Sequence, residues 1–477
     1  MRPVSLKISF GFPVRKGGVL QDTALKSINP FSSELIRVYK EFSPAETAAV
    51  LDSVCSAQKD WSHCSPAVRA NNLQSLGGIL FRRERDLALL MAGEMGKPVS
   101  QGIAELRKCG SCCDYYAQHA ENLLSPEIVK TEAHRSFIYF RPLGVVLAIM
   151  PWNFPFWQVF RCAIPSLMAG NGVVLKHASN VSGCALALEK LFRESGFPEN
   201  IFRTVLLPSS RVGELLQHSA IRAVSVTGST HAGKEIAAAA GKLLKKTVLE
   251  LGGSDPYLVL EDADLKDAAE TCAASRMINA GQSCISAKRF IVVEPVYAEF
   301  EELFTGIMQK QRYGDPQQEG NHFGPLARAD LRDSLHQQVQ RSVDQGARLL
   351  LGGKIPSGPG AFYPATVLTR VTPTMTAATE ELFGPVAALI CARDEKDAVQ
   401  IANGTSFGLG AAVFTRDLER GERIAREEIE AGCCFVNDYV RSDPRLPFGG
   451  VRESGYGREL SSFGLREFTN IKTVQVR

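Results

Sequence analysis

A chain of 477 residues, 45% of them hydrophobic, is long enough to form two or three domains with sizeable cores. Its formal net charge of +3 is nearly neutral and no apolar run reaches the roughly 18 residues of a membrane span, so neither a nucleic acid nor a membrane is indicated as a partner. Its twelve cysteines include adjacent pairs, which is typical of reduced thiols and not of a disulfide scaffold. The composition therefore predicts a cytoplasmic protein that binds a small molecule.

The N-terminal stretch is basic, with no acidic residue before Asp22. This pattern is faintly like a mitochondrial transit peptide. Pro3, Pro13 and the pair Gly17–Gly18 interrupt an amphipathic helix, however, so a plain N-terminal extension is favoured.

Helices are predicted over residues 45 to 123, because Ser43–Pro44 is a helix start and apolar residues recur at three- and four-residue spacing over 66–91. Gly96 to Pro98 interrupts the pattern. Cys109, Cys112 and Cys113 fall in the expected helix 104–123. Because no second cysteine pair has a matching spacing, they do not predict a zinc site.

Strands alternating with helices follow a β-leaning stretch at 137–140. Strands are expected at 144–149, 173–176, 223–226 and 247–251, and helices at 184–195 and 231–244. This alternation predicts a parallel, doubly wound sheet, which binds nucleotides beyond the carboxyl ends of its strands. A second α/β unit is expected over 255–433, with strands at 256–260, 289–293 and 387–390, and a terminal strand at 468–476.

A glycine-bearing turn from Thr227 to Lys234 follows the third of these strands and opens a helix, which suits a phosphate group. Its spacing is close to that of a triphosphate-binding loop, but residue 235 is a glutamate where a magnesium-binding hydroxyl is required. A diphosphate that needs no metal, as in a nicotinamide dinucleotide, fits better than ATP. Lys176 to Ser179, at the end of the second strand, would lie near a ribose, and Ser179 permits either NAD or NADP.

Three residues have the chemistry for attack on an aldehyde. Cys284 supplies a thiol, which needs a base because its pKa is ordinarily about 8.5. Asn153 lies in a loop made rigid by Pro151 and Pro155, and Glu250 ends a strand before a double glycine. Taken singly, each has an ordinary structural alternative: a buried inert thiol, a helix-capping amide and an exposed strand-end carboxylate.

Together these motifs resemble the aldehyde dehydrogenase superfamily over about residues 28 to 477. Residues 149–159, 175–178, 251–256 and 457–461 are similar to the bacterial succinate-semialdehyde dehydrogenases within it. The motifs occur in the family's order, as Pro151-Trp152-Asn153, the strand end at Lys176, Thr227-Gly228-Ser229, Glu250-Leu251-Gly252-Gly253, Gly281-Gln282-Ser283-Cys284 and Glu381-Leu382-Phe383-Gly384-Pro385.

The resemblance implies an α/β aldehyde dehydrogenase fold with three parts. These are a Rossmann-like dinucleotide-binding domain (1–121 and 142–251), an α/β catalytic domain (252–454) and a small oligomerisation flap (122–141 and 455–477). It also implies a homodimer or a homotetramer.

The resemblance further implies that Cys284 attacks the aldehyde, that the Asn153 amide and the Cys284 N–H hold the oxyanion, and that Glu250 activates water. NAD or NADP is the implied cofactor, and no metal is required. The residues implied to position the cofactor are Trp152, Asn153, Lys176, His177, Ala178, Ser179, Gly228, Ser229, Leu251, Glu381 and Phe383.

The substrate is less sharply indicated. A semialdehyde acid needs a cation near its carboxylate, and Arg161, eight residues after Asn153, matches one that succinate-semialdehyde dehydrogenases use. A second arginine, six residues before the catalytic cysteine in some members, is replaced here by Ile278. The other candidates for substrate binding are Arg276, Arg441, Ser442 and Arg445.

Other readings remain open at this point. Glutarate semialdehyde or an uncharged aldehyde would need the same chemistry as succinate semialdehyde. A coenzyme A-dependent acylating enzyme is less favoured, because it would have little use for Glu250. An ATPase and a non-catalytic structural relative are the alternatives from other classes.

Overall fold

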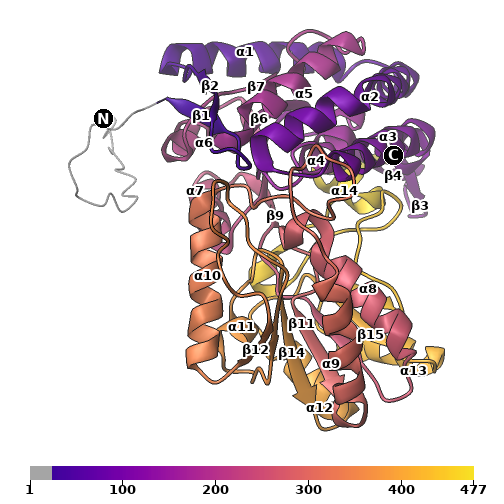
Figure 1. Cartoon of the computed structure of the whole chain (residues 1–477). Coiled ribbons are helices and arrows are strands. Elements are labelled where there is room, and N and C mark those ends of the chain that lie inside the picture. The colour runs from indigo at the N-terminus through magenta and orange to yellow at the C-terminus, as the bar shows by residue number, and fades with distance from the viewer. Residues whose placement is uncertain (1–23) are drawn as a thin grey trace, which may run out of the picture.

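The computed structural model describes residues 24–477, and the predicted N-terminal extension lies mostly outside them. Figure 1 shows an upper part, built mainly from the first half of the chain, above a lower part built mainly from the second half. Within the described residues, no helix is long and apolar enough to cross a membrane.

The upper part contains a six-stranded sheet with the order β17-β9-β8-β5-β6-β7. All neighbouring strands are parallel except the short β17, which runs antiparallel to β9. This order confirms the predicted parallel, doubly wound sheet. Its central strands are buried on both faces, as the continuous apolar runs predicted. The strands are β5 (Val145–Met150), β6 (Gly172–His177), β7 (Phe202–Thr204), β8 (Ile221–Thr227), β9 (Lys246–Glu250) and β17 (Gly455–Tyr456).

The long helices predicted before this sheet are present as α1 (Pro44–Trp61), α2 (Pro66–Met95) and α3 (Val99–Leu123). Ser43 and Glu46 form a capping box at the start of α1. Gly96 ends α2 at φ 78°, where a side chain would lie 2.8 Å from Pro325. A hairpin of β1 (Leu25–Ile28) and β2 (Leu35–Tyr39), which the sequence did not predict, precedes them. The sheet's other helices are α4 (Trp157–Met168), α5 (Ser182–Glu194), α6 (Val212–Gln217) and α7 (Thr230–Gly241).

The lower part contains a seven-stranded sheet with the order β12-β13-β14-β11-β10-β15-β16, parallel except at β12. The predicted second α/β unit is therefore confirmed, although four of its strands were not foreseen. The strands are β10 (Pro256–Val259), β11 (Arg289–Val293), β12 (Arg348–Leu351), β13 (Thr366–Thr369), β14 (Val386–Ala392), β15 (Gly410–Phe414) and β16 (Cys433–Val436). The helices are α8 (Leu265–Met277), α9 (Glu294–Gln309), α10 (Ala329–Asp344), α11 (Thr376–Thr379), α12 (Glu395–Asn403) and α13 (Leu418–Arg423).

A three-stranded antiparallel sheet joins β3 (Glu127–Val129), β4 (Arg135–Pro142) and β18 (Thr469–Val476). Only the last part of the C-terminal range predicted for the flap pairs here. β17 joins the six-stranded sheet instead, and α14 (Ser461–Glu467) packs against α3 and α4. The domain boundaries and the flap's part in oligomerisation stay predictions.

Candidate active site

The loop that carries Cys284 begins with an unusual turn after α8. Asn279, Ala280 and Gly281 follow one another at φ 52°, 55° and 73°, in the left-handed region that side chains disfavour. A Cβ on Gly281 would lie 2.2 Å from the Gly384 carbonyl oxygen, so only glycine fits there. The strained turn places Cys284 between the two large sheets.

Two buried cations hold the carbonyl groups of this loop. The Lys288 Nζ donates hydrogen bonds to the carbonyls of Ser283 (3.1 Å), Cys284 (2.8 Å) and Ser286 (3.1 Å). The Arg276 Nη2 donates to the Gly281 carbonyl at 2.5 Å. The Cys284 N–H, in contrast, has no hydrogen-bond acceptor within residues 24–477, so it remains available as a donor for an oxyanion.

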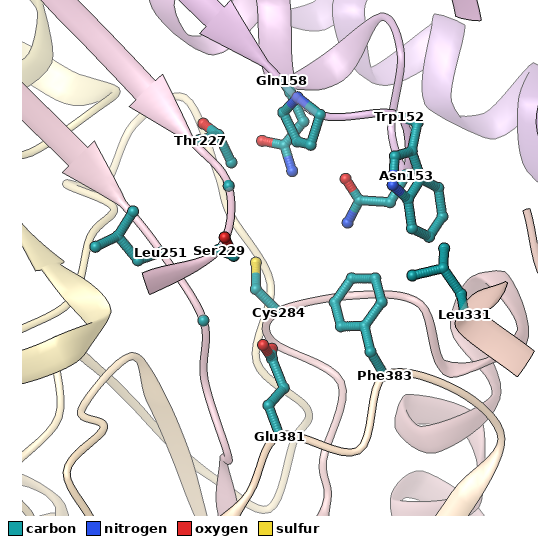
Figure 2. Close-up of a pocket in the computed structure, with 13 residues that line it drawn as sticks. Trp152, Asn153, Gln158, Thr227, Ser229, Leu251, Cys284, Leu331, Glu381 and Phe383 are labelled. Carbon is teal, nitrogen blue, oxygen red and sulfur yellow. The ribbon is translucent and has the colours of Figure 1, made fainter. Parts of the chain in front are cut away.

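Cys284 lies where two cavities meet. The first, of about 260 Å³, is lined by the ends of β8 and β9 and by the segment around Phe383. The second, of about 530 Å³, is lined by residues from α3, α4 and the loop 439–442. Cys284 and Gln158 are the only described residues that line both cavities. In Figure 2 the sulfur points into the first cavity, with Asn153 and Gln158 on one side and Glu381 and Phe383 on the other.

The Asn153 amide is held beside this loop. Its Nδ2 donates to the Gln282 carbonyl at 3.0 Å, and Asn279 donates to the Asn153 carbonyl at 2.8 Å. An amide nitrogen has two hydrogens, so one remains for another acceptor. The structure therefore brings Asn153 and Cys284, which are far apart in sequence, to the same cavity.

Glu250 is placed differently from Cys284 and Asn153. Its carboxyl group is buried and lines neither cavity, and neither of its oxygens has a hydrogen-bond partner in the described part of the chain. The carboxyl faces Gly449, where a Cβ would lie 2.6 Å from Oε1. Burial, together with the nearby charge of Glu459, raises the pKa of Glu250 well above its usual range.

The Cys284 thiol is not activated by its surroundings alone. Burial of the sulfur raises the pKa of the thiol to about 12. The positive charges of Arg161 and Lys288 act in the opposite direction, but their effect is smaller. The thiol is therefore protonated at neutral pH, and its proton must leave before or during attack.

Most of the predicted cofactor residues meet in the first cavity. Glu381 accepts a hydrogen bond from the Gly253 N–H at 3.0 Å. The rings of Trp152 and Phe383 pack edge to face, with their centres 5.7 Å apart. Thr227, which begins the predicted phosphate-binding turn, also lines this cavity. Gln158 was not predicted, because no local signal in the sequence points to it. The predicted residues that line this cavity are Trp152, Asn153, Gly228, Ser229, Leu251, Glu381 and Phe383.

A third cavity, of about 130 Å³, lies beside α7 and is lined by Lys176, Ser209 and Glu235 among others. The Lys176 Nζ donates to the Ser209 hydroxyl at 3.3 Å, and burial lowers the pKa of Lys176 to about 8. The Lys176 ammonium therefore lines a cavity in which it can donate a hydrogen bond to a ligand.

The three residues after Lys176 do not line that cavity, and their part in cofactor binding stays a prediction. The His177 ring is buried. Its Nδ1 accepts from the Ala178 N–H at 2.9 Å, so its Nε2 donates to the Pro155 carbonyl at 2.9 Å. Burial lowers the pKa of His177 to about 4, which keeps the ring neutral. His177 therefore holds the loop of Asn153, and Ser179 begins a short 3₁₀ helix.

Of the five predicted substrate residues, Arg161, Arg441 and Ser442 line the second cavity and two do not. Arg276 is fully buried, and its guanidinium donates a hydrogen bond to the Gly281 carbonyl. Arg445 pairs with Asp443 at 2.6 Å, outside the cavity. The structure therefore does not bring Arg276 and Arg445 to the cavity with the other three. Lys108, which lines the cavity from α3, was not predicted from the sequence.

The sequence profile of the aldehyde dehydrogenase family matches residues 19–474, nearly the whole chain. The chain belongs to the aldehyde dehydrogenase family. This confirms the resemblance and the fold inferred from it. Among the described residues, no group of three or more His, Cys, Asp or Glu side chains is arranged to hold a metal ion.

Relatives within the family share most of this chain. It is 46% identical to a succinate semialdehyde dehydrogenase [NAD(P)+] of Escherichia coli, covering 94% of this chain and 97% of that protein. It is 45% identical to a probable succinate-semialdehyde dehydrogenase [NADP(+)] of Synechocystis, over 95% and 100%. The solved structure of a succinic semialdehyde dehydrogenase from Streptococcus pyogenes in complex with NADP+ superposes with a TM-score of 0.93 at 33% identity, over 95% and 100%.

Gly449 offers a test of Glu250 in this aldehyde dehydrogenase. Gly449→Ala is expected to lower kcat about 10- to 100-fold, because the new Cβ occupies the place of the Glu250 carboxyl and misplaces it. Steady-state kinetics check this, with Gly306→Ala as the control, since a Cβ at Gly306 meets nothing within 4 Å. An unchanged kcat in Gly449→Ala would show that the position of this carboxyl is not critical.

Proposed function

We propose that this protein oxidises succinate semialdehyde to succinate with NAD or NADP as cofactor and Cys284 as nucleophile. The observation that carries the proposal is the position of Cys284, which lies between a cavity at the carboxyl ends of a doubly wound sheet and a second cavity lined by cations. The relatives named as succinate-semialdehyde dehydrogenases support the choice of substrate.

The residues of the first cavity fit a nicotinamide dinucleotide. Thr227 Oγ1 and Gln158 Oε1 are buried there without hydrogen-bond partners among the described residues. The Thr227 hydroxyl can donate or accept and the Gln158 oxygen can accept, while a Cβ on Gly228 would meet nothing within 4 Å, so polar groups and space are available. Ser229 caps the N-terminus of α7, where backbone N–H groups suit a diphosphate. When bound, the nicotinamide ring supplies the hydride acceptor.

The chain's own residues account for formation of the covalent intermediate. Sγ of Cys284 forms a bond to the aldehyde carbon as the S–H bond breaks and its proton passes to water, and the carbonyl electron pair moves to the oxygen. The free hydrogen of the Asn153 amide and the N–H of Cys284 hold the resulting oxyanion, and each such donor typically contributes about 3–4 kcal/mol to the transition state. The oxyanion becomes a carbonyl as the aldehyde hydrogen leaves as hydride, for which a bound nicotinamide would be the acceptor, and a thioester remains on Cys284.

Glu250 is the base that we assign to hydrolysis of this thioester. A carboxylate with a raised pKa accepts a proton from water more readily than an ordinary one. Its carboxyl faces Gly449 in this structure, while the next two residues, Leu251 and Gly252, line the first cavity. We infer that rotation of the Glu250 side chain brings the carboxylate to the water that attacks the thioester.

The second candidate is oxidation of glutarate semialdehyde by the same steps, because the second cavity, of about 530 Å³, has room for a longer chain than four carbons.

The deciding experiment follows reduced-cofactor absorbance with succinate semialdehyde, glutarate semialdehyde and butanal, each with NAD and with NADP. A kcat/KM at least tenfold higher for succinate semialdehyde than for butanal is expected, which corresponds to about 1.4 kcal/mol. Equal values for the two would overturn the proposed substrate.

Lys176 provides a test of cofactor binding. Lys176→Met is expected to raise the Kd of NADP about tenfold or more, because it removes a buried cation with no carboxylate partner among the described residues. Fluorescence titration measures the Kd, and Lys242→Met, at the exposed end of α7, is the control. Equal Kd values in the two variants would remove Lys176 from the cofactor site.

The implied homodimer or homotetramer is proposed to form through the three-stranded sheet. Ile128 of β3 and Ile471 of β18 are 73% and 62% exposed on this one small sheet, and apolar side chains gathered on an exposed face are typical of a protein contact. All twelve cysteines are unpaired in the structure, as is typical of a reducing compartment such as the proposed cytoplasm.

A further inference from the structure

The second cavity has three cations in its wall, and two of them have carboxylate partners. Arg161 pairs with Glu459 at 2.7 Å, and both side chains are buried. Arg441 pairs with Asp438 at 2.7 Å and is half exposed to solvent. The charges of both arginines are thus largely compensated within the protein.

Lys108, the third cation, forms no ion pair with any described Asp or Glu. Its ammonium lies 4.5 Å from the centre of the Trp157 ring and donates to the Ser442 hydroxyl at 2.9 Å. A half-buried cation without a counter-ion is costly, because water no longer solvates it fully. An anion in the cavity would restore the missing partner.

The carboxylates near Lys108 are already engaged elsewhere. Glu105, one turn before it on α3, pairs with the buried Lys97 and accepts from the backbone N–H groups of Phe156 and Trp157 at 2.9 Å. Asp443 pairs with Arg445 at 2.6 Å. The positive charge of Lys108 is therefore directed at the cavity.

Ser442 strengthens this arrangement. Its oxygen accepts from the Lys108 Nζ at 2.9 Å and from the Trp157 Nε1 at 3.0 Å, so both lone pairs are used. Only its O–H remains, and that group donates. The Arg161 Nη2, which is buried without a hydrogen-bond partner in the described structure, adds a further donor beside the same cavity.

We infer that Lys108 is the specificity-determining cation of this enzyme and binds the carboxylate of the semialdehyde substrate together with Ser442. This inference rests on the proposed function. The aldehyde end of the substrate lies at Cys284 and the carboxylate end at Lys108, both of which line the second cavity. Lys108 thereby supplies the charge that the apolar Ile278, in the same wall, does not.

The charge state of Lys108 is compatible with this role. Burial, and then the charge of Arg161, lower the pKa of Lys108 to about 8. At neutral pH the ammonium is therefore still largely protonated and can pair with a carboxylate.

The test compares succinate semialdehyde with butanal, which has four carbons and no charge. Lys108→Met keeps the apolar stem and removes the charge. It is expected to raise KM for succinate semialdehyde at least tenfold, while kcat/KM for butanal changes by less than about threefold. Lys108→Arg is expected to restore most of the preference. Arg107→Met, which removes an exposed cation of α3 that pairs with Glu84 and lies outside the cavity, is expected to leave it nearly unchanged.

The outcomes separate the two proposals. If the wild-type enzyme shows no preference for succinate semialdehyde over butanal, the proposed substrate is wrong. If the wild type has that preference and Lys108→Met keeps it, the assignment of Lys108 alone is overturned. An equal loss on both substrates that Lys108→Arg does not repair also overturns it, because that result assigns Lys108 to packing against Trp157.

Discussion

Cys284→Ser is expected to lower kcat by at least about a thousandfold while leaving the Kd of the dinucleotide unchanged. A serine hydroxyl that has no dedicated base is a far weaker nucleophile than a thiolate. The loop itself should persist, because Lys288 holds it through backbone carbonyls and not through the sulfur. Steady-state turnover and fluorescence titration of NADP measure the two quantities.

The matched control is Cys391→Ser, which changes an exposed cysteine of β14 that lines neither cavity. Its turnover should equal that of the wild type. Substantial activity in Cys284→Ser would refute the assignment of the nucleophile. Loss of dinucleotide binding in that variant would instead assign Cys284 to the architecture of the first cavity.

Glu250→Gln is expected to separate the two halves of the reaction. Reduced cofactor should form in a rapid burst of about one equivalent per site, followed by turnover about 10²- to 10⁴-fold slower than in the wild type, since the thioester lacks its base. Stopped-flow absorbance resolves the burst from the slow phase. If the burst disappears as well, Glu250 acts before the thioester forms.

The pH dependence provides a second measurement of the same residue. A raised pKa means that Glu250 stays protonated to higher pH than an ordinary glutamate, and only the deprotonated form accepts a proton from water. The kcat of the wild type should therefore rise with pH through the raised pKa. Glu250→Gln should lose this rise, because glutamine does not titrate.

Local sequence was sufficient for the N-terminal helices and the central strands of the first sheet, but it did not predict the long helices α9 and α10. Continuous apolar runs predicted strands such as β5 and β6, which the structure buries on both faces. Helix-start and helix-stop signals placed α1 and the break at Gly96. Short strands such as β7 and β16 were missed, because three or four residues carry too little periodicity to be distinguished from loops.

The order of the motifs was enough to identify the family and to nominate Cys284, Asn153 and Glu250. A thiol, an amide and a carboxylate each have a chemical role that the residue type alone indicates. Partners and burial were decided only by the tertiary structure. Arg276 and Lys108 differ little as isolated cations, yet one is fully buried beneath the catalytic loop and the other faces the second cavity without a carboxylate partner. A side chain's solvation and charge depend on residues distant in sequence, so only the folded contacts determine which cation is free to meet a substrate.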